Sequence, residues 1–156
     1  MPLNPGAHPG GANHVANLHV PEITMLAAAV LGLIFSVLSL MVVTQRATGK
    51  VNLGSGETPE AARSTADATP LFVAVRSQAN FSEYVPLALL LIGLIELTAG
   101  PTLLVKLLAG ALVLARLAHP VGMRMNAPNP FRAGGFLLSV VVVAAASVKL
   151  LLMALR

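Results

Sequence analysis

The densest group of chemically capable residues lies at positions 76–86, in the run Arg-Ser-Gln-Ala-Asn-Phe-Ser-Glu-Tyr-Val-Pro. Arg76, Asn80 and Glu83 stand at i, i+4 and i+7, so a helix places all three on one narrow face. The surrounding residues are apolar enough for a membrane helix, in which a charged group costs about 2.5–3.5 kcal/mol at mid-depth. A chain keeps such groups when they face something other than lipid, and we interpret this face as a binding site.

Further cationic side chains are expected near the same end of the protein. Arg46 ends the first apolar stretch, Arg116 and His119 stand three apart in the third, and Arg132 begins the fourth. Glu83 is the acidic residue that opposes this set, and excess positive charge in a low-dielectric environment is stabilised by an anionic ligand. The pattern therefore predicts an anion-binding site.

Each of these residues also has a purely structural interpretation. Arg76 and Glu83 would form an ion pair that joins helices, and His119 would be a cation that complements a helix C-terminus. Arg132 would be a positively charged flank of a membrane helix. Tyr84, at the border of the polar face, would contact either the ligand or the membrane interface.

Composition indicates an integral membrane protein. The 156 residues are 56% hydrophobic and 10% charged, with a mean hydropathy of +0.81, whereas soluble domains carry about 25% charged residues. The net charge is +4, but one Tyr and no Trp provide no basic aromatic surface for nucleic acid. Because the chain has no Cys, disulfides and thiolate metal sites are excluded, and any reactive thiol must arrive on a ligand.

Hydropathy predicts an all-α fold, a bundle of four transmembrane helices. We expect a flexible polar N-terminal tail over residues 1–20 and a membrane domain over 21–156, with helices at about 22–45, 70–98, 101–119 and 131–155. Thr69 and Pro70 are expected to begin the second helix as N-cap and first residue. Pro86 is expected to kink that helix, and the pair His119-Pro120 is expected to end the third.

Three other polar features receive structural interpretations. Gln78 points away from the Arg76 face and is expected to donate a hydrogen bond between helices. Glu96 and Lys106 flank the turn at Gly100-Pro101, where we expect a surface ion pair. The tail histidines do not share a helix face, so we expect solvated side chains and no metal site; they are His8, His14 and His19.

The distribution of Lys and Arg predicts the orientation. One side of the predicted bundle carries the larger basic set, Arg46, Lys50, Arg63, Arg116, Arg124 and Arg132. The other side carries Lys106, Lys149 and Arg156. The positive-inside rule places loops 44–69 and 120–131 in the cytoplasm and both termini outside. No internal repeat or ring-like polar pattern supports a transporter or channel.

The run from Arg76 to Pro86 closely resembles the second-helix signature of the MAPEG family, the membrane-associated proteins of eicosanoid and glutathione metabolism. The shared pattern is Arg-x-Gln/His-x-Asn-x-x-Glu-Tyr-x-Pro. Three further segments are similar: Thr44-Gln45-Arg46, the loop from Val51 to Gly56, which is typical of the bacterial branch, and the run from Ala115 to His119 followed by Arg132. The resemblance covers about residues 23–155.

The resemblance implies a homotrimer that binds glutathione as co-substrate between neighbouring subunits. By position, the glutathione-binding residues would be Arg46, Arg76, Asn80, Glu83, Tyr84, Arg116 and His119. Arg132 matches the arginine that is thought to stabilise the glutathione thiolate and would be the catalytic residue. Met123 and Phe136 replace residues that are tyrosine in well-known members, so a phenolic contact is absent at each.

The implied function is a membrane-bound glutathione transferase that acts on lipophilic electrophiles, with glutathione-dependent peroxidase activity as a second expectation. The expected location is the bacterial inner membrane, and the expected partners are other copies of the chain, membrane lipids and a lipophilic small molecule. The alternative is a non-catalytic binding or scaffold protein that keeps the same fold.

Overall fold

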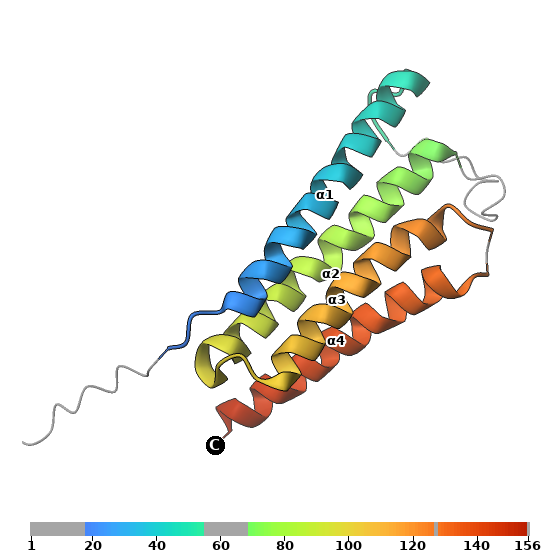
Figure 1. Ribbon diagram of the computed structural model, residues 1–156. Coiled ribbons are helices and arrows are strands. Elements are labelled where there is room, and N and C mark those ends of the chain that lie inside the picture. Colours follow the sequence, from blue (N-terminus) through green and yellow to red (C-terminus); the bar gives the residue numbers. More distant parts are fainter. Residues whose placement is uncertain (1–17, 55–68, 127, 156) are drawn as a thin grey trace, which may run out of the picture.

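A computed structural model describes residues 18–54, 69–126 and 128–155. It contains the helices α1 (Glu22–Gly49), α2 (Pro70–Ala99), α3 (Leu103–Met123) and α4 (Pro130–Ala154), which run side by side along one bundle (Figure 1). The start of α1, the end of α4 and the α2–α3 turn lie at one end, called here the terminal end. The α1–α2 and α3–α4 connections lie at the other, the loop end (Figure 1).

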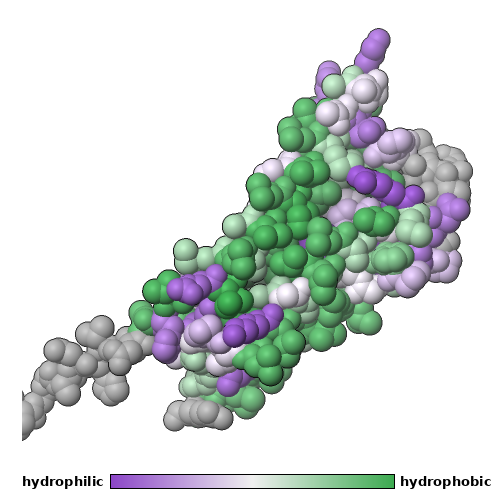
Figure 2. Space-filling model, viewed as in Figure 1, coloured by the Kyte–Doolittle hydropathy of each residue, from purple (hydrophilic) through white to green (hydrophobic). Residues whose placement is uncertain are grey.

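The α2–α3 pair forms the centre of the bundle. α1 and α4 each contact both central helices and lie on opposite sides of them. Leu31, Phe81, Ile92, Leu112 and Val142 are buried in the shared core. Much of the surface between the two ends is apolar on the face shown in Figure 2, and all four helices are long and apolar enough to cross a membrane. The expected all-α bundle with four candidate membrane spans is therefore confirmed.

Two local expectations are confirmed in α2. The Thr69 side chain accepts a hydrogen bond from the Phe72 backbone N–H at 3.1 Å, and Pro70 is the first helical residue. Gln78 Nε2 donates to Ser39 Oγ at 2.8 Å and thereby joins α2 to α1. Both contacts follow from residue types whose local roles are well defined.

The expected end of the third helix at His119 is wrong. α3 continues through Pro120 to Met123, just as α2 continues through Pro86. A proline inside a helix removes one backbone hydrogen bond, but the turn after Pro120 packs tightly against the start of α4. A Cβ atom on Gly122 would lie 2.7 Å from Cα of Arg132. This tertiary contact holds the last turn of α3.

The expected surface ion pair of Glu96 and Lys106 is also wrong. Glu96 is 0% exposed, whereas Lys106 is exposed. The Glu96 carboxylate accepts hydrogen bonds from the backbone N–H groups of Ile23 at 2.9 Å and Thr24 at 2.8 Å, and from the Thr24 hydroxyl at 2.6 Å. It therefore caps the N-terminus of α1, where the helix dipole favours negative charge.

The end of the predicted tail is attached to the bundle. The backbone N–H of His19 donates to the Leu97 carbonyl at 2.9 Å, so the polypeptide is tied to α2 before α1 begins. His8 and His14, and the loop residue Arg63, lie outside the described residues.

Candidate functional site

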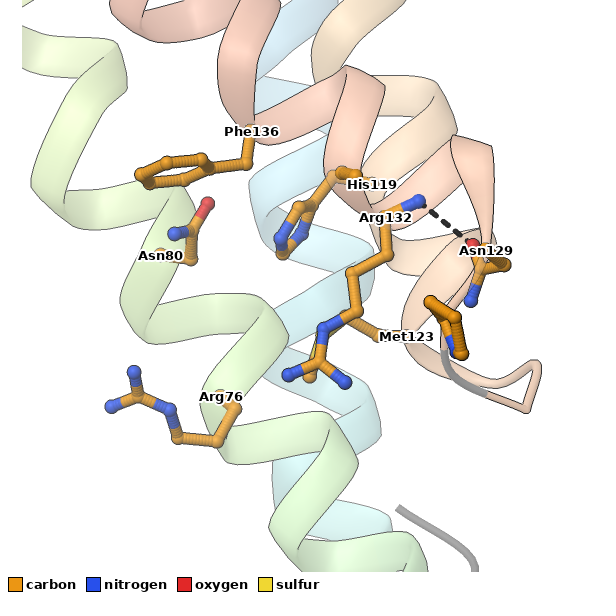
Figure 3. A pocket seen from close by; sticks show the side chains of 9 residues that line it. Arg76, Asn80, His119, Met123, Asn129, Arg132 and Phe136 are labelled. Atoms are coloured by element: carbon orange, nitrogen blue, oxygen red, sulfur yellow. Dashed lines mark hydrogen bonds between the residues drawn. The ribbon is translucent and has the colours of Figure 1, made fainter. Parts of the chain in front are cut away.

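A cavity of about 450 Å³ opens at the loop end, between α2, α3 and α4 (Figure 3). Its polar lining consists of Arg76 and Asn80 from α2, His119 from α3, and Asn129 and Arg132 from the start of α4. The sequence places these residues in separate segments, and the bundle brings them around one space. Arg76, Asn80, His119 and Arg132 are among the residues predicted to form the site.

The apolar lining of the cavity comes from Met123, Pro128, Ala133 and Phe136. Met123 is buried, whereas 42% of the Phe136 surface is exposed. The Phe136 ring also meets the Tyr84 ring edge-on, at 5.7 Å between centroids. The lining therefore offers both apolar and polar contacts to a ligand.

Asn129 positions Arg132 from the N-cap of α4. Its Oδ1 accepts the Arg132 backbone N–H at 2.9 Å, and its Nδ2 donates to the Gly122 carbonyl at 2.9 Å. The half-buried Arg132 side chain extends from this first turn toward α2 (Figure 3). The sequence reasoning missed Asn129, although Asn before Pro130 is the signal of an N-cap followed by proline at the first helical position.

Gly135 brings α4 close to His119. A Cβ atom at this position would lie 2.8 Å from the Ala115 carbonyl oxygen and 2.9 Å from Cβ of His119. Real atoms do not approach so closely, so only glycine permits this spacing of α3 and α4. His119, 6% exposed, is held at the cavity wall by this contact.

Arg116 lies behind the cavity rather than in its lining. Its side chain is 1% exposed. It donates to Asn80 Oδ1 at 2.8 Å, to the Gly135 carbonyl at 3.2 Å and to Ser139 Oγ. The guanidinium carbon also lies 5.7 Å from the centroid of the Tyr84 ring, within the range of a cation–π contact. Arg116 thus joins α2, α3 and α4; Ser139 was not predicted.

The other predicted residues lie apart from the cavity lining in this single chain. Glu83 is exposed on α2, and Arg46 is half-buried near the end of α1. Arg76 is exposed as well, and among the described residues the structure shows no ion pair between Arg76 and Glu83, so the interpretation of these side chains as a self-neutralised pair is not supported. The geometry leaves both groups available on the surface of the protomer.

The arrangement suits an anionic, partly apolar ligand. Two guanidinium groups, two amides and an imidazole line the cavity, and no carboxylate does among the residues that the structure describes. Guanidinium groups bind carboxylates through paired, charge-assisted hydrogen bonds. The described residues contain no cluster of His, Cys, Asp and Glu that could hold a metal ion.

Comparison with known families gives one match. The sequence profile of the MAPEG family matches residues 24–152, a segment that includes nearly all of the four helices and every residue of the cavity lining. Searches of curated proteins and of solved structures give no significant match.

Proposed function

Because this chain belongs to the MAPEG family, we propose that it is an integral membrane glutathione transferase that acts on lipophilic electrophiles. The family includes glutathione transferases and glutathione-dependent peroxidases. One observation carries the proposal: Arg76 and Arg132 line a cavity in which, among the described residues, no carboxylate balances their charge.

Glutathione matches the polar lining of the cavity. Its two carboxylates suit guanidinium groups, and its peptide groups suit the Asn80 amide. Its amino group requires an acidic partner, for which Glu83 is the candidate. Because Glu83 and Arg46 lie outside this cavity in the single chain, we propose that glutathione binds between subunits of a homotrimer, where these two side chains complete the site.

Arg132 is the proposed catalytic residue. A thiol with a pKa of about 8.5 is mostly protonated at neutral pH, and an adjacent cation shifts it toward the reactive thiolate. The sulfur attacks the electrophilic carbon of an aryl halide, the carbon–halogen bond breaks, and halide leaves. Since the chain has no Cys, the nucleophile belongs to the ligand.

Peroxidase chemistry would use the same thiolate. The sulfur attacks the terminal oxygen of a lipid hydroperoxide, the O–O bond breaks, and the alkoxide takes a proton to become an alcohol. The resulting glutathione sulfenic acid condenses with a second glutathione to give the disulfide and water. The hydroperoxide is reduced, and two molecules of glutathione are oxidised.

The acceptor substrate would enter from the bilayer. The exposed ring of Phe136 lines the cavity, and the outer surface of α4 around it is apolar, with exposed Leu137 and Val141. A lipophilic electrophile dissolved in the membrane can therefore approach the cavity without crossing a polar surface.

The test is conjugation of an aryl halide with glutathione by the purified full-length protein. We expect Arg132→Ala to abolish turnover while calorimetry still detects glutathione binding. Arg124→Ala is the matched control, because Arg124 is an exposed arginine at the same end that does not line the cavity. Unchanged turnover in Arg132→Ala would remove Arg132 from the mechanism.

A non-catalytic binding or scaffold protein is the second candidate, favoured by Met123 and Phe136. These residues provide no phenolic hydroxyl at the cavity wall. Calorimetry and thermal-shift measurements with millimolar glutathione distinguish the candidates. Binding without conjugation supports the scaffold, whereas the absence of both heat and thermal shift excludes glutathione as the ligand.

A further inference from the structure

Arg116 is the most deeply buried positive charge near the cavity, and it cannot reach a ligand there. Its Nη1 donates to Asn80 Oδ1 at 2.8 Å and to the Asn80 carbonyl at 3.2 Å. Its Nη2 donates to the Gly135 carbonyl at 3.2 Å and to Ser139 Oγ. The side chain is 1% exposed, so any effect on a ligand must act through the residues that Arg116 holds.

The contact with Asn80 has a consequence for the polarity of the cavity. An asparagine amide offers an oxygen that accepts hydrogen bonds and an NH2 group that donates them, whereas a guanidinium group only donates. The atom of Asn80 that faces Arg116 must therefore be Oδ1. Because Asn80 also lines the cavity, its NH2 group is the part of the amide left for a ligand.

We propose that Arg116 is a positioning residue that fixes Asn80 as a hydrogen-bond donor. The cavity then presents donors from Asn80, Arg76 and Arg132 and selects oxygen atoms of the ligand at all three positions. This inference rests on the proposed function and refines it: Asn80 meets a carboxylate or peptide carbonyl of glutathione, not its ammonium group.

α4 fixes the guanidinium plane in this role. Gly135 and Ser139 accept from Nη2 on one side while Asn80 accepts from Nη1 on the other. Because the guanidinium group is planar and both Nη1 and Nη2 are held, Nη1 keeps a fixed position relative to the amide oxygen of Asn80. A lysine in place of Arg116 would keep one donor for Asn80 but lose the second set of contacts.

Two substitutions of Asn80 separate orientation from structural support. Asn80→Asp keeps an oxygen toward Arg116, and the new ion pair should leave the melting temperature equal to or above that of the unmodified protein. Asn80→Leu removes the Oδ1 acceptor of the buried guanidinium and leaves only its backbone and Ser139 acceptors, so its melting temperature should fall. Both are measured on the full-length protein in detergent, without ligand.

Glutathione binding should weaken in Asn80→Asp, although the melting temperature of this variant does not fall. In Asn80→Asp the second carboxylate oxygen faces the cavity and repels the oxygen atoms of the ligand. We expect the KM for glutathione to rise about tenfold or more, while kcat at saturation and the KM for the aryl halide stay near their original values. The added negative charge contributes to this rise whatever the orientation of the amide, so the Arg116 variants, in which Asn80 stays neutral, provide the test of orientation.

Substitutions of Arg116 provide the rescue test. Arg116→Met frees the amide to rotate and should raise the KM for glutathione. Arg116→Lys retains a donor to Oδ1 and should recover part of the affinity. No difference between the two variants in KM would contradict the proposed orientation.

Two results would overturn the inference: a fall in melting temperature of Asn80→Asp as large as that of Asn80→Leu, or glutathione affinity of Asn80→Asp equal to that of the unmodified protein. Failure of the unmodified protein to bind glutathione would instead overturn the proposed function. In that case the melting temperatures of Asn80→Asp and Asn80→Leu still decide whether Arg116 faces Oδ1.

Discussion

The two ends of the bundle differ in whether their charged groups have partners within the fold. At the terminal end, the buried carboxylate of Glu96 is surrounded by donors from Ile23 and Thr24 of the same chain. At the loop end, Arg76 and Arg132 line a cavity that no carboxylate of the described residues enters. The Glu96 carboxylate has its partners within the fold, whereas Arg76 and Arg132 have room for a ligand.

The difference separates structural from functional charge in a membrane protein. An ionisable residue in a membrane helix is by default a candidate for function, and both ends contain one by sequence. The hydrogen-bonding partners that the fold provides for each charged group distinguish a structural role from a functional one. Glu96 is used to join α1 to α2, so its loss should reduce stability, whereas the loss of a cavity arginine should reduce binding.

The largest effect on stability is expected from Glu96→Ala. It leaves two backbone N–H groups and a hydroxyl without their acceptor, which we expect to cost about 3 kcal/mol. Thermal unfolding in detergent, followed by circular dichroism, measures the change. Glu22→Ala is the control, because Glu22 is exposed in the same turn of α1. Equal effects of the two variants would contradict the capping role.

The next largest effect is expected from Gly135→Ala, which forces α3 and α4 apart. Overpacking of this kind costs about 1–3 kcal/mol, and the movement of His119 should also weaken ligand binding. Gly134→Ala is the matched control, because a Cβ atom there meets nothing within 4 Å. Gly134→Ala should be neutral or slightly stabilising, since alanine favours helix. A tolerated Gly135→Ala would show that the helix spacing is not required.

Asn129→Ala should have a smaller effect on stability, of about 1 kcal/mol, through loss of the N-cap of α4. It should also leave the Arg132 side chain less firmly positioned, so turnover should fall by more than the loss of stability alone would explain. The adjacent control is Asn126→Ala, because Asn126 is exposed and contributes its backbone carbonyl to the cap. Turnover that follows stability alone in both variants would argue against a positioning role for Asn129.

The smallest effect on stability is expected from Arg132→Ala, within about 0.5 kcal/mol of zero. Arg132 stands in the first turn of α4, where the helix dipole disfavours a cation, so its removal should be neutral or slightly stabilising. The melting temperature is compared with that of Glu96→Ala. A fall in melting temperature of similar size in both variants would contradict the proposed difference between the two ends.

The features that the sequence predicts well are local ones. The four spans follow from apolar stretches of sufficient length, and Thr69 with Pro70 begins α2 because both residue types favour that position. Gln78 was correctly assigned to an interhelical hydrogen bond because its face of α2 is opposite to that of Arg76. Each of these inferences needs only a short window of sequence.

The features that escaped prediction depend on distant partners. Glu96 acts on residues 72 and 73 positions away, so no local pattern reveals its role. Arg116 and His119 share a helix face, yet His119 lines the cavity while Arg116 lies behind it. That distinction depends on how α3 is rotated against α2 and α4. The glycine contacts at Gly122 and Gly135 likewise become visible only when two backbones meet.

The capping of α1 by Glu96 also bears on the order of assembly. Glu96 is synthesised 73 residues after Ile23, which corresponds to a delay of about 4–15 s at translation rates of about 5–20 residues per second. The first turn of α1 therefore lacks its carboxylate until the far end of α2 has been made. The N-terminus of the first helix therefore reaches its final hydrogen bonding only after the second helix is complete.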